Sequence, residues 1–140
     1  MATTQQALLP DHVLGAVLAL AEKQNEVTNQ GCDRLAFRSH DFQLQEIFHD
    51  LRETGKYPIL DSFVFSDSGP VPYSPALNES VSRLQLSGLI GRENPDYEVI
   101  FVRSAANRFF DDVLKKNLDP TEINQLEKVA SEFLTRVKTV

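Results

Sequence analysis

The sequence feature that most constrains the fold is a helix with marked ends that leads directly into two short strands. Ser74 is a typical N-cap, and Pro75 suits the first helical position, where its missing N–H costs no hydrogen bond. Gly88 predicts the end of this helix, because glycine readily adopts the left-handed conformation found there. Residues 89–93 and 97–102 are typical strands, and turn-forming residues 94–96 lie between them. We therefore predict a helix, a glycine stop and a β-hairpin.

Two helices are predicted before this unit. Residues 13–21 are all apolar or small, so a helix over residues 11–23 has little polar surface and is expected to be central and buried. Residues 41–54 carry apolar side chains at helical spacing, with Ser39 or Asp41 as the cap and Gly55 as the end. Residues 58–65 predict a short strand, and the turn-rich residues 66–72 follow it.

Two more helices are predicted after the hairpin. Ser104 is expected to cap the first, which carries the apolar residues Phe109, Phe110, Val113 and Leu114. Asp119, Pro120 and Glu122 form a cap, a first-position proline and a capping-box glutamate for the second. Its apolar stripe consists of Ile123, Leu126, Ala130, Phe133 and Val137. This stripe predicts packing on the body of the domain or, alternatively, a homodimer interface.

The predicted order is helix, helix, strand, helix, hairpin, helix, helix. This order indicates a mainly α (α+β) fold and one winged-helix-like domain over residues 1–140, with about five helices, a short strand and a β-hairpin wing. The helix that begins at Pro75 is then the recognition helix of the winged helix, and the hairpin is its wing.

Composition narrows the class of protein. Apolar residues make up 41% and charged residues 24% of the 140 residues, which is ordinary globular usage and argues against disorder. The single cysteine, Cys32, excludes an intrachain disulfide framework. The N-terminus lacks the basic start of a secretory signal, and no apolar run is long enough for a membrane span, so we expect a cytoplasmic protein. The net charge of −6 works against contact with phosphates.

We find no catalytic constellation in the sequence. The GxSxG, GxxxxGK[ST] and GxGxxG motifs are absent. His40 and His49 are nine residues apart, so on one helix they would point to opposite sides and not form an HExxH-like metal pair. Asp111 and Asp112 have no further ligand at metal-binding spacing. We therefore expect no enzyme activity, no metal and no cofactor.

The outward face of the predicted recognition helix is the candidate binding site. With Leu77, Val81 and Leu84 turned inward, helical spacing turns outward Pro75, Asn78, Glu79, Ser82, Arg83 and Leu86. Asn78, Ser82 and Arg83 are residue types that contact bases or phosphates. One arginine offset by one glutamate, with a leucine beside them, suits a protein partner better than a duplex. Such a face is also found on helices that serve only as solvated surface.

Two neighbouring segments complete the candidate site. Arg92 lies in the predicted wing, where it is followed by Glu93 and Asp96 and so lacks the basic surplus of a DNA-tracking wing. Residues 66–74 are expected to form an ordered, exposed loop beside the partner site, because its glycine and prolines restrict the backbone. Tyr73, just before the cap, is either a hydrophobic staple under the helix or an interface anchor.

Part of this unit resembles a known family. Residues 69–77 read Gly-Pro-Val-Pro-Tyr-Ser-Pro-Ala-Leu, and residues 84–90 read Leu-Gln-Leu-Ser-Gly-Leu-Ile. Together they resemble the core of the SocA-like (Panacea) antitoxin family, over about residues 56–102. The resemblance implies a bacterial, phage or mobile-element protein that neutralises a toxin by direct contact, sometimes beside DNA-binding regions. The leading hypothesis is therefore an antitoxin-like protein-interaction module, and a winged-helix DNA-binding regulator is the alternative.

Overall fold

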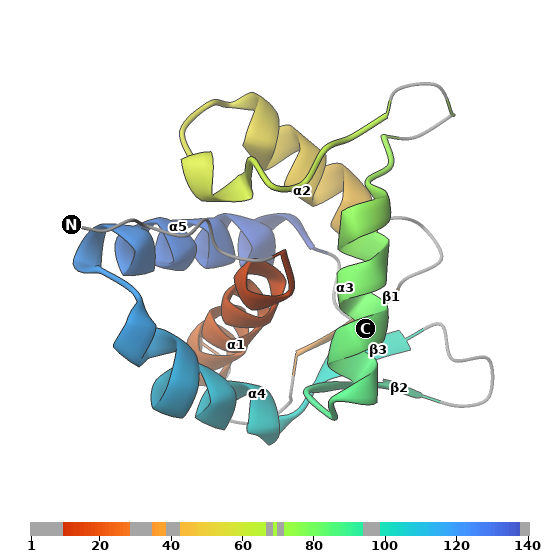
Figure 1. The fold of residues 1–140 in the computed structure, drawn as a ribbon. Helices are drawn as coiled ribbons and strands as arrows, with labels where there is room; N and C mark the ends of the chain where they lie inside the picture. Colours follow the sequence, from red (N-terminus) through yellow and green to blue (C-terminus); the bar gives the residue numbers. More distant parts are fainter. Residues whose placement is uncertain are drawn as a thin grey trace.

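The chain folds into a mainly helical α+β structure with a small antiparallel sheet (Figure 1). The computed structural model describes residues 10–28, 35–38, 43–66, 69, 72–93 and 99–137. The α-helices are α1 (Pro10–Thr28), α2 (Gln43–Glu53), α3 (Pro75–Leu86), α4 (Ser104–Phe109) and α5 (Pro120–Arg136). The strands are β1 (Ala36–Arg38), β2 (Ile90–Glu93) and β3 (Val99–Val102). The predicted α+β class is confirmed, whereas its winged-helix assignment stays a prediction.

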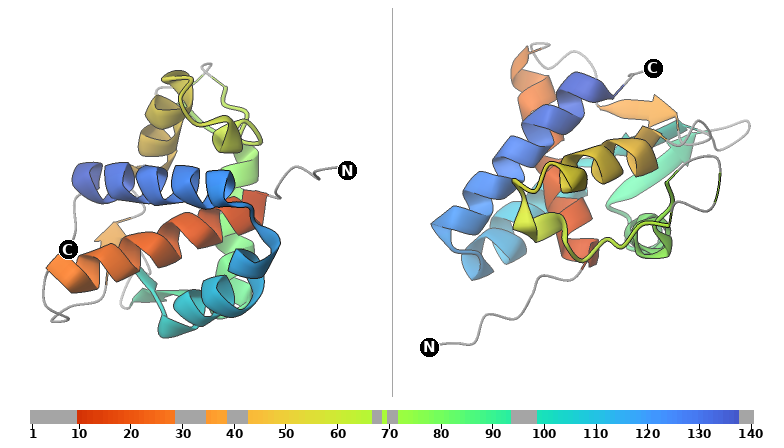
Figure 2. Two further views of the ribbon diagram at one scale, coloured as in Figure 1. Left: turned by 90° about the vertical axis from the view of Figure 1, so that its left-hand side faces the viewer. Right: turned by 90° about the horizontal axis from the view of Figure 1, so that it is seen from above.

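Helix α1 lies at the centre of the structure. It packs against α5, α3 and α4, and Figure 2 shows the blue α5 next to it. Every residue from 13 to 21 is buried, as the nearly continuous apolar sequence predicts. The helix extends to Thr28, beyond the expected end near residue 23. The central position lets one helix supply core side chains to three neighbours.

The sheet has the strand order β1-β3-β2, and both pairs are antiparallel. The predicted hairpin is present as β2 and β3, in which Gly91 lies opposite Phe101. Strand β1 was not predicted, and it adds to the free edge of β3 with Ala36 opposite Phe101. The helix α3 therefore leads into a three-stranded sheet, one strand of which comes from the segment between α1 and α2.

The predicted strand over residues 58–65 is wrong. Residues Pro58–Leu60 form a 3₁₀ turn, η1, in which Leu60 N–H bonds to Tyr57 and Asp61 N–H bonds to Pro58. Leu60 and Phe63 are buried against the helices, so the apolar residues that suggested a strand serve a compact turn instead. The segment becomes extended only towards Ser66, which forms an isolated antiparallel bridge with Tyr73.

The capping predictions differ in outcome. The capping box of Asp119 and Glu122 is present at the start of α5, and Gly55 and Gly88 have the left-handed conformations expected after α2 and α3. Ser104 is not a cap: it is the first residue of α4, and Arg103 is at the N-cap position without a side-chain hydrogen bond. The predicted caps Ser39 and Asp41, as well as Cys32, His40 and residues 94–98, lie outside the described residues.

Aromatic rings join the helices around the core. Phe48 of α2 makes edge-to-face contacts with Phe63 and with Phe133 of α5, at ring-centroid distances of 5.6 and 6.2 Å. Phe133 also meets Phe37 of β1 at 5.5 Å, within the favourable range for aromatic pairs. The predicted stripe of α5 is used in this packing, since Leu126, Ala130, Phe133 and Val137 are buried and Ile123 is half-buried. The predicted packing of that stripe on the body of the domain is confirmed.

None of the helices in the described part of the chain combines the length and apolar character that a membrane crossing needs.

Candidate functional site

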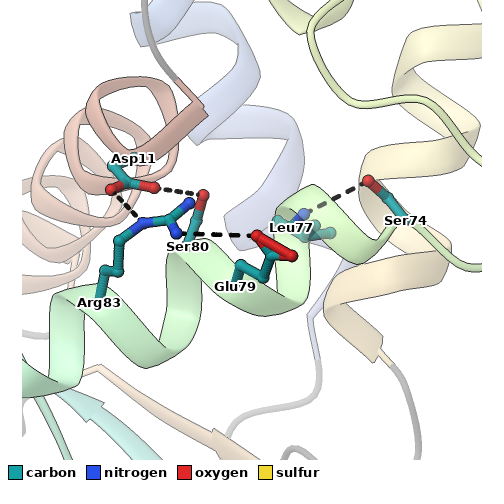
Figure 3. Close-up of polar contacts among 6 residues, drawn as sticks. All are labelled: Asp11, Ser74, Leu77, Glu79, Ser80 and Arg83. Atoms are coloured by element: carbon teal, nitrogen blue, oxygen red, sulfur yellow. Dashed lines mark hydrogen bonds and ion pairs between the residues drawn. The ribbon is translucent and has the colours of Figure 1, made fainter.

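The start of helix α3 is fixed by two sets of hydrogen bonds. The Ser74 hydroxyl accepts a hydrogen bond from the Leu77 N–H at 3.3 Å, which confirms the predicted N-cap (Figure 3). The side chain of Gln45, from α2, accepts a bond from Ser74 N–H at 2.8 Å and donates one to the Ser74 carbonyl at 3.2 Å. Both residues are buried. The buried amide therefore ties the N-terminus of α3 to α2, and this contact was not apparent from the sequence.

The end of helix α3 is a Schellman motif. Gly88, with φ of 80°, donates to the Gln85 carbonyl at 3.1 Å, and Leu89 donates to the Leu84 carbonyl at 3.0 Å. This pattern commonly brings the apolar residues at its two ends together, which here are Leu84 and Leu89. The motif consequently fixes both the end of α3 and the direction in which the chain enters β2.

The inner and outer faces of α3 are those predicted. Leu77, Val81 and Leu84 are buried in the core. The residues predicted to face outward are all exposed: Pro75, Asn78, Glu79, Ser82, Arg83 and Leu86. Leu86 is 87% exposed, the highest exposed fraction among the exposed large apolar side chains of the described residues. The predicted site residues of α3 therefore lie on one accessible face.

Arg83 does not face solvent as a free cation. Its Nε donates a hydrogen bond to Asp11 Oδ2 at 2.6 Å, and its Nη1 lies 3.7 Å from Glu79 Oε2 (Figure 3). The other oxygen of Asp11 accepts a bond from the buried Ser80 hydroxyl at 2.7 Å. Two carboxylates thus offset one guanidinium, and the outward face of α3 carries little net positive potential. The sequence suggested the pairing with Glu79 but gave no signal for Asp11, which is on another helix.

The pKa values of this pair reflect the contact. Partial burial raises the pKa of Asp11, but hydrogen bonds from Arg83 and Ser80, with the nearby positive charge, outweigh it and leave the pKa below its ordinary value. The hydrogen bond to Asp11 raises the pKa of Arg83, and the negative charges of Asp11 and Glu79 act in the same direction. Both groups are therefore held in their charged forms.

Tyr73 and Arg92 lie on either side of α3 along the chain. Tyr73 is 37% exposed, and its backbone pairs with Ser66 through bonds of 2.8 and 3.1 Å. A hydrophobic staple pairs the residue before the cap with the fourth helical residue, which here is the exposed and polar Asn78. The side chain of Tyr73 thus lacks the usual staple partner. The backbone of Arg92 lies in β2 opposite Ile100, and its side chain lies outside the described part of the structure.

A pocket of about 270 Å³ opens beside the C-terminal half of α3. It is lined by residues from α1, α3, the following turn and the end of α4: Asp11, His12, Arg83, Leu84, Ser87, Leu89 and Phe109. The rings of His12 and Phe109 are 6.3 Å apart and tilted by 48°. We call this space the α1–α3–α4 pocket. It could not be predicted from the sequence, because its walls come from three distant segments.

Comparisons of the chain with protein-family models, with curated proteins and with solved structures find no match. Within the described residues, no three His, Cys, Asp or Glu side chains come together as a possible metal site. The candidate site is therefore defined by the structure alone. It consists of a helix with hydrogen-bonded ends, an exposed leucine, an ion-paired arginine and an adjoining pocket.

Proposed function

We propose that this protein is a protein-interaction module that binds its partner through the outward face of α3. The observation that carries the proposal is the contrast between two neighbours on that face. Arg83 is paired with Asp11 at 2.6 Å, whereas Leu86 is 87% exposed. The cores of protein interfaces are depleted in charged residues, so an exposed leucine beside an ion-paired arginine suits a protein partner better than a phosphate backbone.

We further propose that the module is the antitoxin-like component of a toxin–antitoxin pair. The support for this step is the resemblance of the segment around α3 to the SocA-like (Panacea) family. That segment contains both the exposed face and the capped start of the helix. An antitoxin that acts by direct contact needs a preorganised surface, and the bonds from Gln45 and Ser74 hold the start of α3 in place.

The test is a co-expression experiment with the product of the adjacent gene. We expect that product to arrest growth alone and to be harmless beside this protein. Leu86→Arg should abolish the rescue and weaken the complex at least about 30-fold, the effect of losing a hot spot of about 2 kcal/mol. Val113→Arg is the matched control, because Val113 is also an exposed apolar residue, 46% exposed, but lies beyond α4. Absence of both toxicity and complex formation would refute the antitoxin proposal.

A DNA-binding regulator is the second candidate function. Its support is the order of α3, β2 and β3, with Asn78 and Ser82 exposed on α3 in the manner of a recognition helix. On this alternative the chain binds its own upstream DNA in a salt-sensitive way. Arg83→Ala should then weaken specific binding by about 1–3 kcal/mol. If an electrophoretic mobility-shift assay at moderate salt shows no binding to this DNA, the alternative is excluded.

A further inference from the structure

The α1–α3–α4 pocket adjoins the proposed binding face. Arg83 belongs to both, since it projects from the outward face of α3 and lines the pocket. Apolar side chains form much of the lining, namely Leu84, Leu89 and Phe109. Polar groups lie among them from α1 and from the turn after α3. The pocket therefore has the mixed lining that small binding sites use, with apolar walls and a few polar groups that fix orientation.

Two local structures build the pocket. The Schellman motif at Gly88 sets Leu84 and Leu89 at the two ends of the turn that forms one wall. On the opposite side, α4 ends at Phe109 and continues as a π-helical turn, Phe110–Leu114. Turns of this kind are rare and frequently occur at functional sites. Phe110 is buried, whereas Phe109 stays only partly buried and lines the pocket.

The polar groups of the pocket favour an uncharged occupant. Both carboxylate oxygens of Asp11 are already bonded, to Ser80 and to Arg83. The guanidinium uses its Nε for that bond, and the Nη1 contact with Glu79 is 3.7 Å, too long for a hydrogen bond. A guanidinium has five N–H groups, so donors remain on Arg83 beyond its contacts with Asp11 and Glu79. The neighbouring carboxylates oppose an anion, and the guanidinium opposes a cation.

We infer that this pocket receives one aromatic side chain of the protein partner, of the tyrosine class. The volume of about 270 Å³ lies just below the range of drug-sized sites, roughly 300–1,000 Å³, and suits a single ring. Phe109 and His12 supply an aromatic wall for edge-to-face packing, and Arg83 supplies a donor for the phenolic oxygen. Buried tyrosines are frequent interface anchors. The inference rests on the proposed function, because the ring belongs to a protein bound at α3.

The first test uses a small probe and needs no partner. N-acetyl-tyrosinamide should bind the isolated protein with a dissociation constant of about 1 mM or tighter, a strength typical of a ligand of this size. In two-dimensional NMR spectra it should shift the signals of Leu84, Leu89 and Phe109. N-acetyl-leucinamide should bind at least about threefold more weakly, since it lacks a ring. Equal binding of the two probes, or no shift at these residues, would overturn the inference whether or not a partner exists.

The second test fills the pocket and measures the complex. Ser87→Tyr introduces a ring at an exposed residue of the pocket lining, and Ser131→Tyr makes the same change on the exposed face of α5. Ser87→Tyr should remove the probe-induced shifts and weaken the partner complex at least about tenfold, whereas Ser131→Tyr should leave both unchanged. Circular dichroism verifies the fold of each variant. A complex that tolerates Ser87→Tyr but not Leu86→Arg would refute the pocket inference and preserve the proposed function.

Discussion

The buried side chain of Gln45 should be one of the larger single polar contributions to stability. Gln45→Leu keeps a similar volume but removes both hydrogen bonds to Ser74, at 2.8 and 3.2 Å. The Ser74 carbonyl keeps its hydrogen bond from Asn78 N–H at 3.2 Å. The Ser74 N–H, however, loses the acceptor that Gln45 provides, and Ser74 is 0% exposed. An unsatisfied buried donor costs about 1–3 kcal/mol, and the leucine recovers part of that by apolar burial.

We therefore expect Gln45→Leu to lower the free energy of unfolding by about 2 kcal/mol, which corresponds to a fall of about 6 °C in melting temperature for a chain of this size. Urea unfolding followed by circular dichroism measures the first quantity, and hydrogen exchange of the Ser74 amide should accelerate. Gln125→Leu is the matched control, since Gln125 accepts only one described bond, from Ile59 N–H at 3.3 Å. A loss below about 0.5 kcal/mol, or one equal to that of Gln125→Leu, would refute the reasoning.

Three further predictions concern single substitutions. Gly91→Ala should lower the free energy of unfolding by about 1–3 kcal/mol, because the new Cβ would come within 2.4 Å of the buried Phe101 ring. Urea unfolding measures this loss, and an unchanged unfolding midpoint would contradict the prediction. Gly15→Ala should instead stabilise by about 0.5–1 kcal/mol in the same assay, since its Cβ meets only Leu84 at 3.5 Å within a helix interior; any destabilisation would contradict the fit. Asp11→Asn should cost about 1 kcal/mol at about pH 7 and less at about pH 3. The sign follows from the pKa of Asp11, which is lower in the folded protein than its ordinary value near 4. The stabilisation by ionised Asp11 is present above that ordinary pKa and is lost as the pH falls through the lower pKa of the folded state. An equal cost of the substitution at both pH values would contradict this prediction.

Local signals in the sequence predicted the helices well. Ser74 with Pro75, and Asp119 with Glu122, satisfy the backbone groups of helix starts within a few residues, so their effect does not depend on the rest of the fold. The apolar stripe of α3 likewise predicted its buried face and, by subtraction, the exposed residues of the candidate site. The hairpin after Gly88 was predicted because its signals, a glycine stop followed by strand-forming and turn-forming residues, are also local in the sequence.

Features that depend on distant segments could not be predicted from the sequence. Strand β1 has three residues, too few for a period, and is a strand only because β3 offers it a partner. Residues 58–65 have the composition of a strand, but the packing of Leu60 and Phe63 on the helices favours a compact turn. The bond between Arg83 and Asp11 joins α3 to α1, so the pairing with Glu79 on the same helix was visible in the sequence but the bond to Asp11 was not.

The central place of α1 has a consequence for synthesis in the cell. Helix α1 is made before α5, which follows it by about a hundred residues, yet the two helices pack together. At about 5–20 residues per second, the ribosome leaves this apolar helix without that neighbour for roughly 5–20 seconds. During that interval the nascent chain presents an aggregation-prone segment that resembles a chaperone substrate. The domain therefore completes its core only after α5 has emerged from the ribosome.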